Sequence, residues 1–577
     1  MRRGTLLCCL MLPCVLPAEE ITITDADITA PNTVVFESEN TYILDGIVYV
    51  DSGATLEIAA GTTVKAKTAA ALVVARHGTI SAVGTAEDPI VFTAESDDGS
   101  LTMEDDSLWG GIVILGNAPV IAVEGEGIPG LPEDGAKAEY GGDDAEDNSG
   151  VLEYVSIRHA GRAVEGGAGM AGLAFGGVGS GTTVDFVEVA ATGFDGIEFH
   201  GGTVACKHLV SVFTGEKNFE FTEGWYGKGQ FWFSLENFDT TDYDNVTAFH
   251  NGVNNEETGQ TPALANVTFL GDGQRDGRII RSHHGLFFKN NTSARYYNSL
   301  FQDYTGKAFC VEDAQEPDSL DCRKRMENGD LFAKGCIFYL FGKNDEPDSN
   351  FVFMWDTLPG GDALPVFKTQ QYAYNAMGTP QDSADYTQIQ EIFSSEWGSY
   401  TASASGGIFR IERDFSEETL NPAVHPLSEG YDPQYLPLAE LSDEWFETVN
   451  YRGAFGADSN DVWIDGWTYL AQCGGRRATG VAGPAGAVAA NRNVFEVPEV
   501  VQRGGNAVSI RIPLRTDRAL DARIYDSRGR LCCRFARRGL TAETRVVELP
   551  LEGLGGGMYL CRLRSGLSNA AYPLVIP

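Results

Sequence analysis

The chain has 577 residues and a formal net charge of −39 at pH 7. That length is too great for one compact core, although an elongated repeat body escapes the limit because every repeat adds its own core. A surface so acidic repels nucleic acid, which excludes nucleic-acid binding as a function. The excess acid either keeps an exported protein soluble or binds cations.

Residues 1–18 are typical of a signal peptide. Arg2 and Arg3 supply its positive region, and the apolar run from Leu6 to Leu16 is too short to span a bilayer. A lipoprotein leader is the alternative, with Cys14 as the acylated residue. No later segment is apolar enough to cross a membrane, so we expect an exported protein at the cell surface or free outside the cell.

Short strand-like runs repeat through residues 19–342 of the body at intervals of roughly 20–30 residues. Leu152–Ile157 and Val184–Val189 share the order apolar, acidic, aromatic, Val, polar, apolar, and a weaker third copy starts at Val204. The pattern predicts an all-β fold, a right-handed parallel β-helix with β-branched and aromatic residues pointing inward. A β-propeller is the alternative, but the sequence has neither blade-like spacing nor a WD signature.

Residues 343–475 are less regular and are predicted to form an irregular cap on the body, which extends over residues 19–475. Ser383–Phe393 is the best helix candidate, with Ser383 or Asp382 as its N-cap. The end of a β-helix needs a cover for its open edge. The aromatic segment Trp445–Leu470 is the candidate for that cover.

A composition change near residue 476 marks a second domain. Residues 476–493 are rich in Gly, Ala and Pro and are typical of a flexible linker. Residues 494–577 contain several short alternating runs, with a hairpin turn at Asp526–Gly529, and predict a small β-sandwich. Residues 476–577 carry 16 Arg, no Lys and 8 acidic residues, so this end is basic although the chain is acidic.

Eight cysteines follow the leader, and none has the spacing of a zinc site. Cys310 with either Cys322 or Cys336 is a candidate disulfide in an exported protein. Cys206 and Cys336 lie inside strand-like runs, where cysteine commonly serves as a small buried hydrophobe.

The acidic loop of residues 140–150 is a candidate calcium site. Calcium binds six to eight oxygens from carboxylates and carbonyls, and this Gly-flanked loop supplies four carboxylates. The alternative is a solvated loop between two turns of the helix. The four candidate ligands are Asp143, Asp144, Glu146 and Asp147.

Three carboxylates on neighbouring runs are candidates for catalysis on a polysaccharide: Asp195, Glu198 and Glu223. A glycosidase needs two carboxylates that flank the scissile bond. The alternative is that these residues are ordinary outward residues in a corner. The paired Asp-Asp and Gly-His-Gly motifs of polygalacturonases are absent from the sequence.

Two groups of residues are candidates for ligand binding. Aromatic rings stack on sugars through their apolar faces, and a basic cluster attracts an anionic sugar. The alternatives are that the aromatic residues fill the core and that the basic residues pair with nearby surface acids. The candidates are Trp225, Tyr226 and Lys228, and then Arg281, His283 and His284.

The C-terminal domain resembles the type A sorting domain of the Bacteroidota type IX secretion system. The resemblance is carried by the stretch RIYDSRGRLCCRF (Arg523–Phe535) and by GLGGGMYLCRL (Gly553–Leu563). It implies that residues 494–577 are an address read by the type IX secretion machinery in the outer membrane.

The body resembles a group of exported Bacteroidota proteins. The resemblance is carried by WGGIVILGNAP (Trp109–Pro119), YGGDDAEDNSG (Tyr140–Gly150), and Arg452–Gly456 followed by Gly466–Thr468. It spans residues 40–475 and implies a surface protein.

The sequence therefore predicts an exported β-helix that binds or adheres to polysaccharide without catalysis, with calcium holding one loop. The first alternative is a polysaccharide lyase or glycoside hydrolase that acts along one face of the helix, and the second is a passive surface-layer protein. Three carboxylates that converge at one groove would favour the enzyme.

Overall fold

The computed structural model describes most of the β-helix body and the strands of the C-terminal domain. The helix predicted at Ser383–Phe393 lies outside the described residues. Among the described residues, no helix combines the length and the apolar character needed to cross a membrane. The described residues are 19–121, 127–132, 137–163, 169–236, 246–252, 260–271, 284–304, 309–313, 321–341, 352–356, 400–401, 413–414, 419–420, 441–449, 451–456, 462–473, 499–503, 507–513, 520–526, 531–537, 546–550, 557–565 and 568–576.

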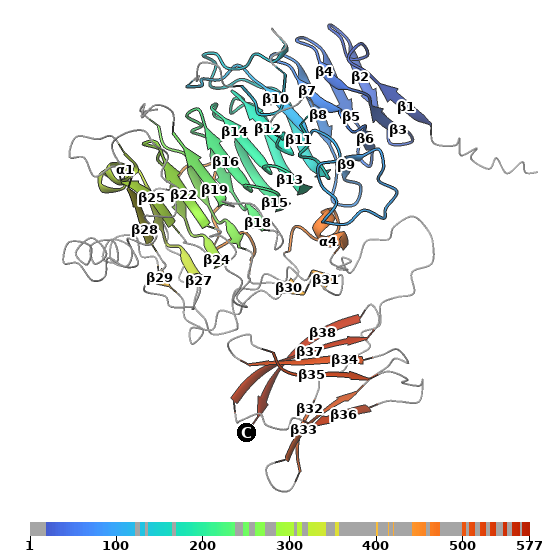
Figure 1. Ribbon diagram of the computed structural model, residues 1–577, viewed down its shortest axis with the longest axis vertical. Coiled ribbons are helices and arrows are strands. Elements are labelled where there is room, and N and C mark those ends of the chain that lie inside the picture. The colour runs from blue at the N-terminus through green and yellow to red at the C-terminus, as the bar shows by residue number, and fades with distance from the viewer. Residues whose placement is uncertain are drawn as a thin grey trace, which may run out of the picture.

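One long sheet, here called sheet B, contributes one strand to each turn of the body. Its ten strands are all parallel and follow one another in sequence order along the body (Figure 1). They are β4 (Ile47–Val50), β7 (Ala71–Val74), β10 (Ile112–Leu115), β12 (Leu173–Gly176), β14 (Ile197–His200), β16 (Phe219–Thr222), β19 (Val246–Asn251), β22 (His284–Lys289), β25 (Phe309–Asp313) and β28 (Val352–Asp356).

The second wall, sheet A, contributes either two short strands or one long bent strand to each turn. All of its pairings are parallel as well, so the body is a parallel β-helix, as predicted. Connections between parallel strands are right-handed, which gives the predicted hand of the helix. The strands are β1 (Glu20–Ile23), β2 (Thr33–Phe36), β3 (Thr41–Leu44), β5 (Thr55–Ile58), β6 (Thr63–Ala66), β8 (Thr79–Val83), β9 (Ile90–Ala94), β11 (Gly150–Arg158), β13 (Thr183–Thr192), β15 (Ala205–Thr214), β17 (Lys228–Gln230), β18 (Phe233–Leu235), β20 (Ala263–Ala265), β21 (Thr268–Leu270), β23 (Arg295–Tyr297), β24 (Leu300–Tyr304), β26 (Phe332–Lys334), β27 (Ile337–Phe341) and β29 (Tyr400–Thr401).

The repeat read from the sequence corresponds to the strand register. Leu152 pairs with Val184, and Val184 pairs with Cys206, so the two clear copies and the weaker third copy are successive turns. The core consists of columns of identical side-chain positions. Phe175, Phe199 and Phe221 form one such column, with neighbouring ring centroids 5.3 and 5.2 Å apart. Each turn adds one buried side chain to such a column, so the apolar core extends along the whole body. A compact domain has its apolar contacts in one central core instead.

In the turns from β11 to β24, sheet A bends at one residue in each turn, and that residue has a left-handed backbone. The φ angles are 50° at Tyr154, 52° at Phe186, 45° at His208 and 60° at Phe231, and Asn266 follows at 54°. The rings stack on one another, with centroids 4.4, 4.1 and 4.9 Å apart. These aromatic residues therefore lie at the bend and form a ladder along the body. They differ in this from the core phenylalanines, which point inward as the sequence predicted.

The described residues of the segment 441–473, here called the strap, lie along the outer face of sheet A. The strap ends in the short helix α4 (Tyr469–Cys473), beside β13 (Figure 1). The amide nitrogens of Tyr469 and Leu470 donate to the carboxylate of Glu188 at 2.6 and 3.0 Å. The segment expected to cover the open edge at the end of the helix thus covers the side of several turns instead.

The apolar seam under the strap explains this position. Val210, Val212, Phe233 and neighbouring residues on the outer face of sheet A are buried against strap residues such as Phe455 and Leu470. An apolar outer face of this kind needs a cover, because its exposure to water would cost free energy.

The C-terminal strands form two antiparallel sheets, which agrees with the predicted β-sandwich class. The hairpin from β34 to β35 flanks the turn predicted at Asp526–Gly529. One sheet contains β32 (Glu499–Arg503), β33 (Ala507–Pro513) and β36 (Val546–Pro550), and the other contains β35 (Leu531–Arg537), β34 (Leu520–Asp526), β37 (Gly557–Ser565) and β38 (Ser568–Ile576).

Candidate functional site

Two glutamates lie opposite each other on the outer face of sheet B. In β14, Ile197 and Phe199 are in the core, so Glu198 between them points outward. The same alternation in β16 turns Glu220 outward, and Glu198 and Glu220 are register partners. Two like charges in this position repel each other, so they need a compensating charge nearby.

Asp195 completes a group of three carboxylates. It lies in the turn before β14, is fully buried, and accepts a hydrogen bond from the backbone nitrogen of Lys217 at 2.8 Å. One carboxylate oxygen from each of Asp195, Glu198 and Glu220 lies within 4.8 Å of the others. Within the described part of the chain, no other group of three or more acidic, histidine or cysteine side chains meets this spacing. We call this group the acidic trio.

The side chain of Lys217 is the cation nearest to the acidic trio. Its Nζ atom lies 3.1 Å from Oδ2 of Asp195, 3.3 Å from Oε2 of Glu220 and 3.5 Å from Oε2 of Glu216. Four carboxyl groups, counting Glu198, therefore share one ammonium group. Their negative charge exceeds the positive charge available from Lys217.

This excess of negative charge acts on the pKa values of the three trio carboxyl groups and of Lys217. Burial, together with the charge of Asp195, raises the pKa of Glu198 and of Glu220 well above the usual value. Burial opposes ionisation of Asp195 too, but the charge of Lys217 outweighs it and the pKa of that carboxyl is lowered. The carboxylates in turn raise the pKa of Lys217 despite its burial. The trio therefore favours a proton or an additional cation.

A row of polar side chains continues from the trio along the same face. Nε2 of His200 lies 2.9 Å from Oε2 of Glu198, whereas Oε1 of Glu198 has no hydrogen-bond partner among the described residues. The ring of Tyr140 packs edge-on against His200, and its hydroxyl donates to both carboxylate oxygens of Glu223, at 3.0 and 2.9 Å. Of the three predicted catalytic carboxylates, Asp195 and Glu198 meet directly, and Glu223 lies at the far end of this row.

The predicted sugar-stacking residues are placed differently. Trp225 is buried, its Nε1 donates to the carbonyl of Val204 at 3.2 Å, and its ring packs against Phe221. Tyr226 is half-buried. Lys228 forms an ion pair with Asp443 of the strap. The ring of Trp225 therefore packs in the core and does not form a surface on which a sugar could stack.

The predicted basic cluster is only partly described. Arg281 and His283 lie outside the described residues. His284 is buried at the start of β22, with Nδ1 3.5 Å from Sγ of Cys310. Cys206, Cys310, Cys322 and Cys336 are all buried and not disulfide-bonded, so neither candidate disulfide of Cys310 is formed.

One of the four candidate calcium ligands in the acidic loop is buried. Asp147 accepts from Oγ of Ser149 at 3.3 Å and from the backbone nitrogen of Gly179 at 3.4 Å, which ties the loop to the next turn. Asp143, Asp144 and Glu146 are exposed. A calcium-binding role for this loop stays a prediction.

Residues 27–384 match a protein family described as "Pectate-lyase like beta helix domain". That match covers more than half of the chain and agrees with the stacked parallel sheets. None of the curated proteins matches this sequence.

Proposed function

The chain belongs to the pectate-lyase-like β-helix family, and we propose that it binds an anionic polysaccharide through a divalent cation held by Asp195, Glu198 and Glu220. The observation that carries the proposal is the convergence of these three carboxylates within 4.8 Å beside a single lysine. This is a binding function, and no cleavage of the polymer is required for it.

The donor set fits calcium. Calcium prefers six to eight oxygen ligands, and three carboxylates offer up to six, with water or a bound ligand completing the shell. A buried carboxylate oxygen without a partner, such as Oε1 of Glu198, is a strong acceptor for such an ion. A cation held there would supply the positive charge that attracts a uronate carboxylate.

The charge of the whole chain favours a cation-mediated contact. A formal net charge of −39 repels any polyanion that approaches the body directly. A divalent cation lowers this repulsion locally and can bridge two carboxylates. Lys217 and Glu220 are partly exposed, with 19% and 16% of their side-chain surface accessible, so the trio has an opening to the outside.

The proposed setting is the cell surface. The short apolar leader of residues 1–18 and the basic domain of residues 494–577 support export through the type IX secretion machinery, by the resemblance given above. The β-helix would then present sheet B to polysaccharide outside the cell.

The direct test is calorimetric titration of the full chain with calcium. We expect one site that is lost in Glu198→Gln and Glu220→Gln. It should persist in Glu57→Gln, an exposed carboxylate of β5 that serves as the matched control. Polygalacturonate should be retained by the wild type with calcium and released by chelator. Calcium binding that survives both trio variants but disappears in the double variant Asp143→Asn, Asp144→Asn would move the site to the acidic loop and overturn the proposal.

A polysaccharide lyase or hydrolase is the second candidate. The pairs Glu198–His200 and Glu223–Tyr140 favour it, because they place proton-carrying groups along the row that starts at the trio. Release of unsaturated or reducing sugar ends by the wild type, and its loss in His200→Gln and in Tyr140→Phe, would establish catalysis. Retention of the polymer without new ends would support binding alone.

A further inference from the structure

Two columns of outward side chains on sheet B change from buried to accessible at the same strand, β16. In the first column, Val113, Ala174 and Glu198 are successive register partners, and all three are buried. Glu220 follows Glu198, and 16% of its side-chain surface is accessible. The acidic trio therefore lies at the boundary between a covered and an open part of this face.

The second column changes at the same point. Leu115, Gly176 and His200 are successive register partners and are buried. Thr222, which follows His200 in the column, is half-buried. Two columns that open at one strand indicate a single cover that ends beside β14.

That cover is the described part of residues 127–142, here called the cover loop. Ile128 and Leu131 pack on the outer face of the first turns of sheet B. At Gly176 the ring of Tyr140 is so close that an added Cβ would lie 2.9 Å from Cγ of the tyrosine. The same ring packs edge-on against His200, with 6.4 Å between the centroids. The cover loop therefore forms a wall on the N-terminal side of the trio.

The accessible surface on the other side of the trio is short. Phe249 follows Glu220 in the first column and is half-buried, and Nζ of Lys217 lies 5.7 Å from the centroid of its ring. The next member of the column, Phe287, is buried again. The opening in this column thus extends over β16 and β19 only, which lie about 5 Å apart.

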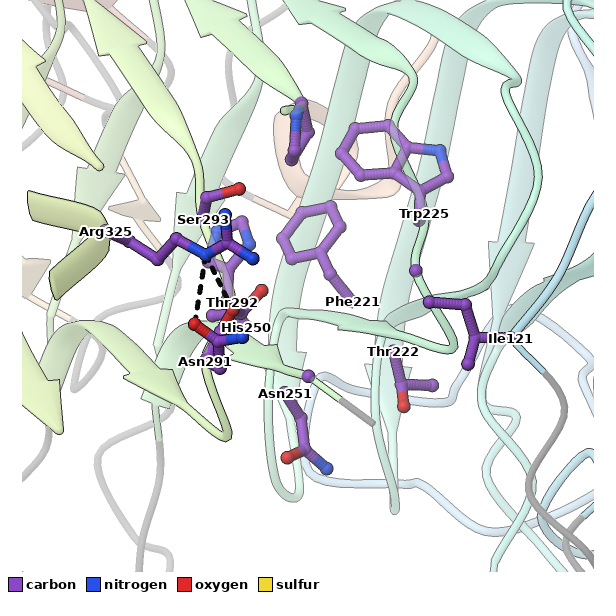
Figure 2. A pocket seen from close by; sticks show the side chains of 13 residues that line it. Ile121, Phe221, Thr222, Trp225, His250, Asn251, Asn291, Thr292, Ser293 and Arg325 are labelled. Atoms are coloured by element: carbon purple, nitrogen blue, oxygen red, sulfur yellow. Dashed lines mark hydrogen bonds between the residues drawn. The ribbon is translucent and has the colours of Figure 1, made fainter. Parts of the chain in front are cut away.

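The second column continues the opening as far as β22. Asn251 and Lys289 are register partners, and both are half-buried. Thr222 and Asn251 lie at the ends of β16 and β19 (Figure 2). They also line a corner pocket whose described lining has no acidic side chain, so the cation site does not extend into that corner. The open surface therefore reaches from the trio to Lys289.

The groups on this open surface match the first few residues of a uronate chain. An apolar ring such as that of Phe249 can contact the face of a sugar ring. The amide of Asn251 can form hydrogen bonds with hydroxyl groups, and the ammonium group of Lys289 attracts a further carboxylate. On the opposite side of the trio, a sugar ring would collide with the cover loop.

We propose that the acidic trio receives the end of a uronate polymer. The carboxylate of the terminal residue would bind the cation, and the following residues would extend toward β22. End binding rests on the proposed function, because the cation is the first contact. It goes further by naming the part of the polymer that is bound, since the wall leaves no surface for a chain that continues in both directions.

The test is the number of protein molecules that bind one polymer molecule, measured for the full chain in calcium by light scattering. Galacturonate oligomers and polygalacturonate fractions of increasing length serve as probes, and each polymer alone in the same buffer gives the baseline for its own association. We expect the number of bound proteins to stay constant as the length increases. A number that increases in proportion to length would show binding along the chain and would overturn the proposal.

Competition and calcium titration complete this test. At equal mass, polygalacturonate cut at random into shorter pieces should compete better, in proportion to its number of ends. Calorimetric titration with calcium alone separates end binding from the proposed function. If the trio binds no calcium, the proposed function fails. If it binds calcium but the number of bound proteins follows the polymer length, only end binding fails.

Two lysine variants test the direction in which the chain extends. Lys289→Ala should weaken the binding of trigalacturonate about threefold, as expected for the loss of one partly exposed charge contact. Lys137→Ala is the matched control, because Lys137 lies over Tyr49 on the covered side of the trio and should not contact the ligand. A loss in Lys137→Ala with none in Lys289→Ala would place the chain over the cover loop and contradict the proposal. The binding number needs no variant, so it answers the question even if a variant fails to fold.

Discussion

The Nζ atom of Lys217 lies 3.1 Å from Oδ2 of Asp195, and Asp195 is fully buried while the Lys217 side chain stays partly exposed. This pair is the charged centre of the acidic trio. A lysine in this position stabilises part of the negative charge and leaves the rest for a proton or a cation. Its removal should therefore make the body depend on an added cation.

The variant Lys217→Met tests that dependence. Loss of one partner from a buried ion pair commonly costs about 3–5 kcal/mol. We expect a loss of this size in the free energy of unfolding in chelator, with partial recovery in calcium. Thermal and chemical unfolding under both conditions would measure it. Lys228→Met is the matched control, because its exposed pair with Asp443 should contribute about 1 kcal/mol or less. An equal loss with and without calcium would speak against a cation at the trio.

The stability of the body should depend on pH in a direction set by Glu198 and Glu220. Their pKa values are raised from the usual 4.5, so folding favours their protonated forms. In chelator, the stability they contribute is present at low pH and is lost as the pH rises through the raised pKa values. The lowered pKa of Asp195 acts oppositely, but only below its usual value of 3.8. Melting temperatures measured upward from about pH 5 should fall.

Bound calcium should reduce the dependence of the melting temperature on pH, and so should substitution of the trio glutamates. A bound cation requires ionised carboxylates, so calcium affinity should increase with pH and binding should release protons. The double variant Glu198→Gln, Glu220→Gln should have little slope in chelator. Calorimetry in buffers of different ionisation enthalpy would count the released protons. A profile that is equally steep in the variant and in the wild type would assign the pH dependence to other groups.

The strap should loosen when its anchor at Glu188 is changed. This carboxylate accepts from the amides of Tyr469 and Leu470 and from Oγ of Ser156, at 2.6, 3.0 and 2.6 Å. Glu188→Gln replaces one accepting oxygen by a donor, so at least one buried donor loses its partner, at a cost of about 1–3 kcal/mol. Hydrogen exchange at the amides of residues 469 and 470 should accelerate. Glu57→Gln should change neither quantity, and unchanged exchange in Glu188→Gln would show that the apolar seam alone holds the strap.

At the bend of sheet A, a glycine variant should be more stable than an alanine variant, which reverses the usual order in a strand. Asn266 has φ of 54°, a region that glycine adopts freely and alanine does not. Both variants lose the hydrogen bond from Nδ2 to the carbonyl of Tyr451. We expect Asn266→Ala to be less stable than Asn266→Gly by about 1 kcal/mol in chemical unfolding. At Val83, an exposed strand residue, alanine should be the more stable substitution. If the alanine variant is the more stable one at both positions, the backbone at the bend relaxes in the variants and the left-handed conformation is not required.

The register of the helix was predictable because each strand repeats a local pattern. Leu152 and Val184 occupy equal places in two short runs, and the structure pairs them. Two of the three residues of the acidic trio, Asp195 and Glu198, were among the predicted catalytic carboxylates, since they lie in or directly beside one strand-like run. Glu220 occupies the place of Glu198 in the next turn, and an alignment of the runs IEFH and FEFT would have found it.

The strap and the aromatic ladder could not be predicted in the same way. Tyr469 meets Glu188 across 281 residues, and no local pattern encodes a contact of that range. The aromatic position of the repeat was visible at Tyr154 and Phe186, but alternation alone places it in a straight strand. The left-handed backbone at that residue is seen only in the three-dimensional structure.

The most direct test of the central claim is to locate the cation. Crystals of the full chain soaked with a lanthanide in place of calcium would reveal the ion by its anomalous scattering. The account predicts a peak bonded to oxygens of Asp195, Glu198 and Glu220, about 2.3–2.6 Å from each as for calcium. A peak at the loop of Asp143 and Asp144, with Lys217 still filling the trio, would contradict it.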